Sequence, residues 1–328
     1  MQCCNFFTIK MMNLQIVFFV SLISCNPIFG GKGKDYKQEK TEAIQILQSN
    51  LITQSEWVKV HSAEFLLWTG HPEGIKDVFL EEEKKFGKDS PYRIGIWRVL
   101  AQAETKPEEK EKWIQKILQA FTDENGKDQV HAAETLAKLR ISPLKDYPDI
   151  TQRAMEAGNK SLSLYTRWSN CYVSLDSLKS VRDAFLELIF SKEKNTHKPL
   201  AAYVIRQSGI LEEERWTLLA QSALSEPKDS DIRINLLNTA FVCVDEEMVQ
   251  SDLFKQVYKE LLEYKNITDN NIWIKIADGL AENGQPEDIT LLSSFLKTNV
   301  SSVDPISADL RAFVSYAILR ICNRWKLN

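Results

Sequence analysis

The stretch that decides the fold is WVKVHSAEFLLWTGHPEGI, at residues 57–75. Its apolar residues recur at the three- and four-residue spacing of a helix face and stop at Gly70. Pro72 follows two residues later, and a proline at the first position of a helix loses nothing by lacking an N–H. The stretch therefore predicts one helix that ends at Gly70 and a second that starts at Pro72 and packs antiparallel to the first.

The same pattern returns further along the chain. Residues 60–66 read VHSAEFL and residues 130–136 read VHAAETL, a separation of 70 residues. A second echo occupies residues 270–289, where Gly284 is predicted to end one helix and Pro286 to start the next. Two helix pairs of about 35 residues each give this period, which lies in the range of helical solenoids. Small residues on the repeated helices are expected to let the pairs approach closely; these are Ala63, Ala133 and Ala277.

Helix-period segments alternate with short breakers from residue 38 onward, and no stretch has the alternation expected of a strand. The predicted class is all-α. The predicted architecture is a right-handed α-solenoid of antiparallel helix pairs over residues 38–328.

Residues 130–139, VHAAETLAKL, resemble the first helix of HEAT-like repeats of the phycobilin-lyase type. Residues 57–75 and 273–289 resemble the turn and second helix of such repeats, and Arg233 stands at their basic position. The resemblance is faint over residues 143–228. It implies an armadillo-like superhelix and carries no activity, because such repeats mostly scaffold partners.

The amino terminus is predicted to be a lipoprotein signal peptide at residues 1–24. Its apolar run, LQIVFFVSLI at residues 14–23, is half of the roughly 20 residues that span a bilayer. The run ends in LISC at residues 22–25, which resembles a bacterial lipobox and predicts lipidation of Cys25. Residues 25–37 then form the lipidated cysteine and a flexible tether. An ordinary signal peptide cut nearby is the alternative.

A lipid on Cys25 implies residence in the cell envelope of a Gram-negative-type bacterium. Asn26 is not the aspartate associated with inner-membrane retention, so the outer membrane is favoured, with the protein facing the periplasm or the surface. Lys+Arg 41 against Asp+Glu 45 gives a net charge of −4, which argues against a nucleic-acid partner.

Three further cysteines follow Cys25: Cys171, Cys243 and Cys322. They are widely spaced, odd in number and set in apolar helical stretches. A disulfide framework needs clustered pairs, and zinc needs paired ligands, so we expect buried thiols that act as small apolar side chains.

Two His-x-x-Glu pairs are the sharpest candidates for a metal site: His61 with Glu64, and His131 with Glu134. Residues three apart share a helix face and can ligate one ion. HEAT-repeat di-iron enzymes use His-Glu dipeptides, however, and this chain has none. The favoured interpretation places the histidines at the usual arginine position of the repeat, with the glutamates in hydrogen bonds between repeats. Nucleophile elbows, P-loops and dinucleotide fingerprints are missing, so no catalytic residue, metal or cofactor is predicted.

Two clusters of hot-spot residue types are predicted to bind a partner on the concave face. They are Tyr92, Arg93 and Trp97, and Tyr165, Arg167 and Trp168. Tyr92 is expected to be exposed in the first turn of a helix that starts at Pro91, with Arg93 and Trp97 sharing a face. The alternative is that Trp97 packs under the neighbouring repeat.

Three functions remain open. The favoured one is a non-catalytic scaffold, anchored to a membrane by its lipid, that binds a protein partner in the envelope. By resemblance, that partner is expected to be an envelope protein or a solute-uptake transporter such as a sodium–solute symporter. The second function is a glycan- or small-ligand-binding lipoprotein with aromatic platforms. The third is a metal-dependent HEAT-repeat enzyme, which requires the His/Glu pairs to converge.

Overall fold

The all-α class predicted from the sequence is confirmed. The computed structural model describes residues 35–191, 196–298 and 304–327, so the predicted signal peptide and Cys25 lie outside the described residues. The unit Asp35–Asn328 holds, in its described part, sixteen α-helices, three short 3₁₀ helices and no strand. Within those same ranges, no helix combines the length and apolar character needed to cross a membrane.

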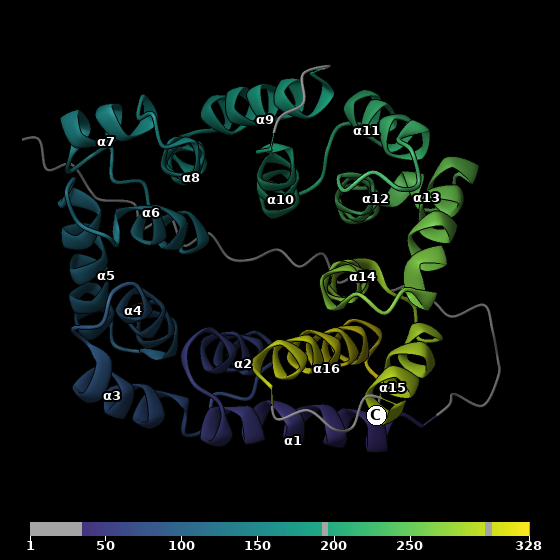
Figure 1. The fold of residues 1–328 in the computed structure, drawn as a ribbon, viewed down its shortest axis with the longest axis horizontal. Helices are drawn as coiled ribbons and strands as arrows, with labels where there is room; N and C mark the ends of the chain where they lie inside the picture. Colours follow the sequence, from purple (N-terminus) through teal and green to yellow (C-terminus); the bar gives the residue numbers. More distant parts are fainter. Residues whose placement is uncertain (1–34, 192–195, 299–303, 328) are drawn as a thin grey trace, which may run out of the picture. The chain divides into compact units, whose positions relative to one another are not determined.

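The helices of this unit alternate along the chain between an outer and an inner row (Figure 1). The outer helices are α1 (Lys37–Thr53), α3 (Ile75–Phe86), α5 (Pro107–Thr122), α7 (Pro148–Met155), α9 (Leu175–Phe190), α11 (Glu213–Ser225), α13 (Asp252–Glu263) and α15 (Asp288–Thr298). The inner helices are α2 (Glu56–Trp68), α4 (Tyr92–Ala103), α6 (Gln129–Lys138), α8 (Lys160–Asn170), α10 (Lys198–Ser208), α12 (Arg233–Val242), α14 (Asn270–Asn283) and α16 (Pro305–Trp325). The 3₁₀ helices are η1 (Cys171–Val173), η2 (Glu246–Met248) and η3 (Tyr264–Asn266).

The inner row closes on itself. Each inner helix contacts the next one along the chain, and α16 contacts α2. Phe65 of α2 stacks on Tyr316 of α16, with 4.4 Å between the ring centroids. The Asn50 side chain of α1 donates a hydrogen bond to the Ala308 carbonyl of α16 at 3.4 Å. The first and last helices of the unit are therefore packed together, a contact that the repeat pattern did not predict.

The 70-residue echo connects equivalent inner helices. Its two copies lie on α2 and α6, with α4 between them, and the later echo lies on α14. Ala63, Ala133 and Ala277 are each 0% exposed, as expected of small residues where helices approach closely. The repeated sequence therefore marks the buried faces of the inner row.

The helix starts predicted at Pro72 and Pro286 are wrong. The helices begin later, α3 at Ile75 and α15 at Asp288. The Pro72 carbonyl accepts a hydrogen bond from the Ile75 amide at 3.3 Å, and Gly74 between them has a φ of +75°. That backbone conformation favours glycine, so Pro72 belongs to the turn and α3 starts only after it. At the second turn the Pro286 carbonyl accepts a hydrogen bond from the Ile289 amide at 3.2 Å.

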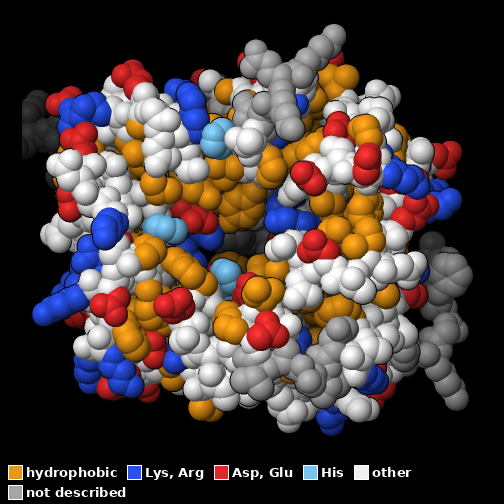
Figure 2. All heavy atoms as spheres, in the orientation of Figure 1, with side chains coloured by type: hydrophobic (Ala, Val, Ile, Leu, Met, Phe, Trp, Pro, Cys, Tyr) orange, Lys and Arg blue, Asp and Glu red, His pale blue; other side chains and the backbone are white. Residues whose placement is uncertain are grey.

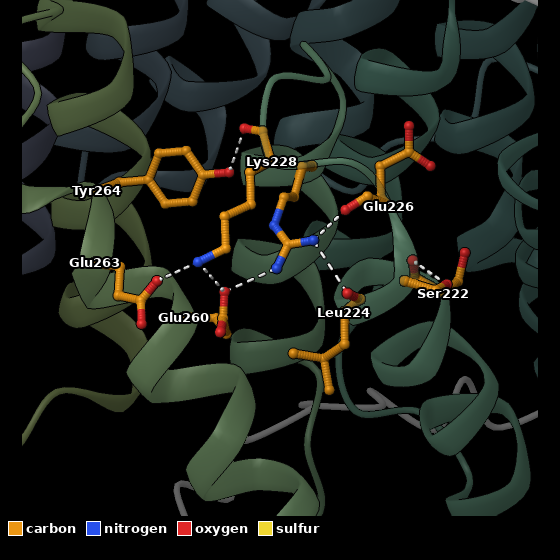
Figure 3. Close-up of polar contacts among 9 residues, drawn as sticks. Ser222, Leu224, Glu226, Lys228, Glu260, Glu263 and Tyr264 are labelled. Carbon is orange, nitrogen blue, oxygen red and sulfur yellow. Dashed lines mark hydrogen bonds and ion pairs between the residues drawn. The ribbon is translucent and has the colours of Figure 1, made fainter.

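Arg233, the arginine that resembled the repeat signature, ties three helices together in the region of Figure 3. Its Nη1 donates to the carbonyl oxygens of Leu224 and Glu226 at the end of α11. Its Nη2 donates to Glu260 Oε2 of α13 at 2.8 Å. Arg233 is 4% exposed. This arginine therefore holds the turn between α11 and α12 against α13.

The prediction that Cys171, Cys243 and Cys322 are buried is confirmed. Each is a free thiol with 0% exposure. Burial raises the pKa of Cys171 to about 11 and that of Cys243 to about 12. These two thiols therefore stay protonated near neutral pH, where they act as small apolar side chains.

Candidate binding site on the inner helices

The inner helices surround a hollow that opens on the face shown in Figure 2, and acidic, basic and histidine side chains gather around it. Electrostatic interactions connect charged and tyrosine side chains from helices that are far apart in the sequence. Arg98 of α4 interacts with Tyr203 of α10, and Tyr203 interacts with Asp278 of α14. We call this set the inner lining: Glu64, Arg98, Glu134, Lys138, Tyr203, Arg206, Lys275, Asp278, Glu282 and Arg320.

The strongest contact in the inner lining is a bidentate ion pair. Arg98 donates from Nε to Glu64 Oε1 at 2.7 Å and from Nη2 to Oε2 at 2.8 Å, and both side chains are 2% exposed. Its Nη1 donates to Thr135 Oγ1 of α6 at 3.2 Å, so one guanidinium connects α2, α4 and α6. Burial opposes ionisation of Glu64, but the charge and hydrogen bonds of Arg98 outweigh it and lower the pKa to about 2.

This pair also positions an exposed tryptophan. Gln102 donates to Glu64 Oε1 at 2.7 Å, and its own Oε1 accepts a hydrogen bond from Trp68 Nε1 at 2.7 Å. Trp68 nevertheless remains 45% exposed. It belongs to an α2–α16 aromatic cluster, in which edge-to-face and stacked rings contact one another, made of Phe65, Trp68, Phe313 and Tyr316.

A second ion pair lies on α6. Lys138 contacts Glu134 at 2.9 Å, with side chains 20% and 19% exposed, and its ammonium lies 6.0 Å from the ring centroid of Tyr203. Burial opposes ionisation of Glu134, but the charges of Lys138 and Arg98 lower its pKa below the ordinary value. The carboxylate therefore stays ionised beside two cations.

A third contact connects α10, α12 and α14. Arg206, whose side chain is 2% exposed, has its Nε 3.2 Å from Asp278 Oδ2, and its Nη1 donates to Thr239 Oγ1 at 3.1 Å. Asn238 Nδ2 donates to the same Asp278 oxygen at 3.1 Å. The guanidinium lies 5.6 Å from the ring centroid of Tyr203. Arg206 therefore occupies the same kind of position between three inner helices as Arg98 does.

The two His-x-x-Glu pairs do not converge. His61 Nδ1 lies 2.8 Å from Asp309 Oδ1 of α16, whereas His131 stacks on Trp57 with 5.5 Å between the rings. Glu64 is engaged by Arg98 of the neighbouring inner helix, and Glu134 by Lys138 one turn along its own helix. In the described part of the chain, no three His, Cys, Asp or Glu side chains gather as a metal site would require.

In the first predicted partner-binding cluster, the side chains are bonded to other residues of the same chain. Tyr92 was expected to be exposed, and this expectation is wrong: it is 6% exposed and its hydroxyl donates to Glu82 at 2.6 Å. Trp97 is 7% exposed, and Arg93 forms an ion pair with Asp128. The acidic side of α3 faces this part of α4 and supplies the hydrogen-bond acceptor that water would otherwise provide.

The second predicted cluster is divided between the core and the surface. Trp168 is 1% exposed, whereas Tyr165 is half-buried and Arg167 is exposed. Burial, then the charges of Glu134 and Tyr203, raise the pKa of Tyr165. Tyr165 therefore lies close to the inner lining, and Trp168 belongs to the core.

Sequence reasoning did not select Arg206, Lys275 or Asp278. Their signal is a charged residue within an otherwise apolar helix, as Lys275 and Asp278 are in NIWIKIADGL at residues 271–280. Such a residue faces either solvent or a polar interior, and the helical period alone does not separate the two cases.

No family model matches the chain, and comparisons with curated proteins and with solved structures found no match. What the inner lining can do must therefore follow from its own contacts. The inner lining offers paired charges and the half-buried Tyr203, and the exposed Trp68 is connected to it through Gln102. Aromatic and charged side chains of this kind bind ligands and partner proteins.

Proposed function

We propose that this chain is a non-catalytic scaffold that binds a protein partner through its inner helices. The observation that carries the proposal is Trp68, a large aromatic residue that is 45% exposed yet held by a hydrogen bond beside the buried Glu64–Arg98 pair. A rigid, half-exposed tryptophan next to charged groups has the properties of a binding hot spot. A transporter or another envelope protein is the proposed partner, with a lipid on Cys25 holding the scaffold at the outer membrane.

The proposed architecture is a right-handed solenoid of HEAT-like helix pairs whose last pair meets its first. The alternation of outer and inner helices, and the echo on α2, α6 and α14, support this proposal. Because solenoids bind partners on the face formed by one row of helices, the inner row is the proposed binding face.

The electrostatics of the inner lining support a role without catalysis. A general base works best when its pKa lies near the operating pH. The pKa of Glu64 is about 2, and that of Glu134 is lowered by its neighbouring cations. Both carboxylates are committed to ion pairs and are poor proton acceptors near neutral pH.

A second candidate function is the binding of a glycan or another small ligand. The same exposed Trp68 favours it, because an aromatic face of this kind can stack on an apolar sugar face. Its indole N–H already donates to Gln102, which fixes the ring before a ligand arrives.

Site-specific crosslinking tests the proposed binding face. A photoreactive phenylalanine analogue replaces Trp68 in one variant and Leu218, which is 51% exposed on the outer helix α11, in a matched control. We expect one discrete protein adduct in cells from position 68 and none from position 218. Identical adducts from both positions would contradict an inner binding face. If a glycan quenches the tryptophan fluorescence of the native chain but not that of Trp68→Phe, and no protein adduct forms, the second function would be favoured.

The membrane anchor is tested separately. Replacing Cys25 with alanine removes the thiol that a lipid would occupy, so the protein should move from the detergent phase to the aqueous phase, or remain uncleaved. Cys322→Ala is the matched control, since Cys322 is buried in α16 and should not affect partitioning. Unchanged partitioning of the Cys25 variant would contradict the anchor.

A further inference from the structure

Two buried arginines occupy comparable places between inner helices but are satisfied to different degrees. Arg98 donates a hydrogen bond from Nη1 to Thr135, and its Nε and Nη2 both donate to the Glu64 carboxylate. Arg206 likewise donates Nη1 to a threonine of the next inner helix, Thr239. Its Nε, however, makes no hydrogen bond within the described residues, since the contact with Asp278 at 3.2 Å lacks hydrogen-bond geometry. Arg206 thus lacks the second carboxylate contact that Arg98 has.

The inner lining also contains one more basic side chain than acidic side chains. Four of its acidic side chains are matched one-to-one by basic ones, in the pairs Glu64–Arg98, Glu134–Lys138, Asp278–Arg206 and Glu282–Arg320. Lys275 lies three residues before Asp278 on α14, so the two side chains share one face of the helix. Lys275 is half-buried, interacts electrostatically with Arg206 and Asp278, and forms no ion pair with a described residue. Two cations therefore share the single carboxylate of Asp278.

We propose that Arg206 and Lys275 form a binding site for an anionic group, a carboxylate or a phosphate, of a small ligand that enters the inner lining. The guanidinium edge that Glu64 fills at Arg98 faces Asp278 at Arg206, with 3.2 Å between Nε and Oδ2, so the ligand anion competes with Asp278 for this edge. Guanidinium groups bind carboxylates and phosphates through two parallel hydrogen bonds, and the Lys275 ammonium adds a point charge.

The surroundings fit such a ligand. Arg206 is 6% exposed and is already held by Thr239 and by the ring of Tyr203, so little conformational freedom is lost on binding. Burial, with the nearby charge of Arg206, lowers the pKa of Lys275. An added anion offsets both effects, so the anion and the Lys275 proton are expected to bind cooperatively.

This site goes beyond the proposed function, because a scaffold for a protein partner does not need it. The anion-binding site and the partner-binding face can each be disproved without the other. Anion binding is measured on the purified full-length chain with simple anions, whereas partner binding is measured by crosslinking from position 68 in cells.

Lysine labelling tests the site directly. The full-length chain is methylated with limiting formaldehyde and cyanoborohydride near neutral pH, with and without inorganic phosphate or acetate at constant ionic strength. Mass spectrometry reports the rate at each lysine. Lys255, which is 60% exposed on α13, serves as the reference lysine. Phosphate or acetate should slow Lys275 several-fold and leave Lys255 unchanged, because a bound anion favours the protonated amine.

Three variants separate a charge effect from a structural one. Lys275→Met should abolish the rise in melting temperature that the anion causes, and Lys255→Met should retain it. Asp278→Asn should tighten anion binding several-fold, since it removes the competing carboxylate without changing the side-chain shape. A response to acetate alone assigns a carboxylate, and a response to phosphate alone assigns a phosphate. Equal slowing of both lysines, no slowing of Lys275, or no tightening in Asp278→Asn would overturn the proposal.

Discussion

Buried arginines are the residues that hold the inner row together. Arg98 reaches α2 and α6 from α4, and Arg206 reaches α12 and α14 from α10. Each is nearly inaccessible to water, with a side chain 2% exposed. A buried guanidinium is costly without hydrogen-bond and charge partners, and the partners of these two arginines come from other inner helices. Each arginine therefore makes the positions of its neighbouring helices interdependent.

Removing one partner of the Glu64–Arg98 pair should therefore be costly. We expect Glu64→Gln to lower the free energy of unfolding by about 3–5 kcal/mol in urea titrations, because Arg98 is left charged and buried. Replacing both residues, by Glu64→Leu with Arg98→Met, should recover most of that loss. The exposed pair Glu109–Lys112 is the control, and Glu109→Gln should change stability by about 0.5 kcal/mol or less. Equal effects at both sites would contradict the importance of burial.

The same pair predicts a loss of stability in acid. The pKa of Glu64 is lowered from 4.5 to about 2 in the folded protein, so its contribution is fully present above the unfolded value. The contribution is lost as the pH falls from about 4.5 toward 2. In that interval, stability should fall more steeply for the native chain than for Glu64→Gln, as measured by urea titration at each pH.

Helices α12 and α14 of the inner row approach each other closely at a glycine. Gly279 of α14 faces Asn238 and Phe241 of α12, and a Cβ added there would lie 2.5 Å from Asn238 Oδ1 and 3.3 Å from Phe241 Cδ1. Asn238 is 0% exposed and hydrogen-bonded to Asp278, so it has no free space into which to turn. The glycine therefore sets the distance between α12 and α14.

Gly279→Ala should consequently destabilise the protein by about 1–3 kcal/mol, despite the better helix propensity of alanine. The matched control is Gly158→Ala, where an added Cβ meets nothing within 4 Å. Thermal unfolding followed by circular dichroism compares the two. If Asn238→Ala restores the stability of Gly279→Ala, the clash is the cause; a neutral Gly279→Ala would refute the close contact.

At the scale of the whole unit, closure of the inner row makes distant parts of the chain depend on one another. In an open repeat array each pair contacts only its neighbours, so removing the last helix affects only the end. Here α16 packs on α14, α1 and α2, and the Phe65–Tyr316 stack spans most of the sequence.

Deleting residues 305–328 should therefore expose α2 as well as α14. Hydrogen exchange with mass spectrometry should show loss of amide protection in α2, where Phe65 is 3% and Leu66 is 1% exposed in the intact chain. Helices α6 and α8, which are not among the helices packed closely against α16, serve as the internal reference. Protection of α2 that survives the deletion would show that closure contributes nothing to stability.

Local signals in the sequence determined the helices and their pairing. The period of the apolar residues predicted the elements, and the echo between residues 60–66 and 130–136 predicted equivalent helices that the structure places on α2 and α6. Helical period is a local property, so it needs no knowledge of the rest of the chain. It also predicted correctly that the small residues and the three later cysteines are buried.

Only the tertiary structure decided which polar side chains meet. Tyr92 and Trp97 have the residue types of a binding surface, yet the acidic side of α3 covers them. Arg206 and Asp278 are 72 positions apart in the sequence and become neighbours because α10, α12 and α14 are consecutive in the inner row. Whether a charged side chain is buried, and whether it has an ion-pair partner, depends on helices that are distant in the sequence. A helical pattern records which face of its own helix is apolar and carries no information about what another helix brings to the polar face.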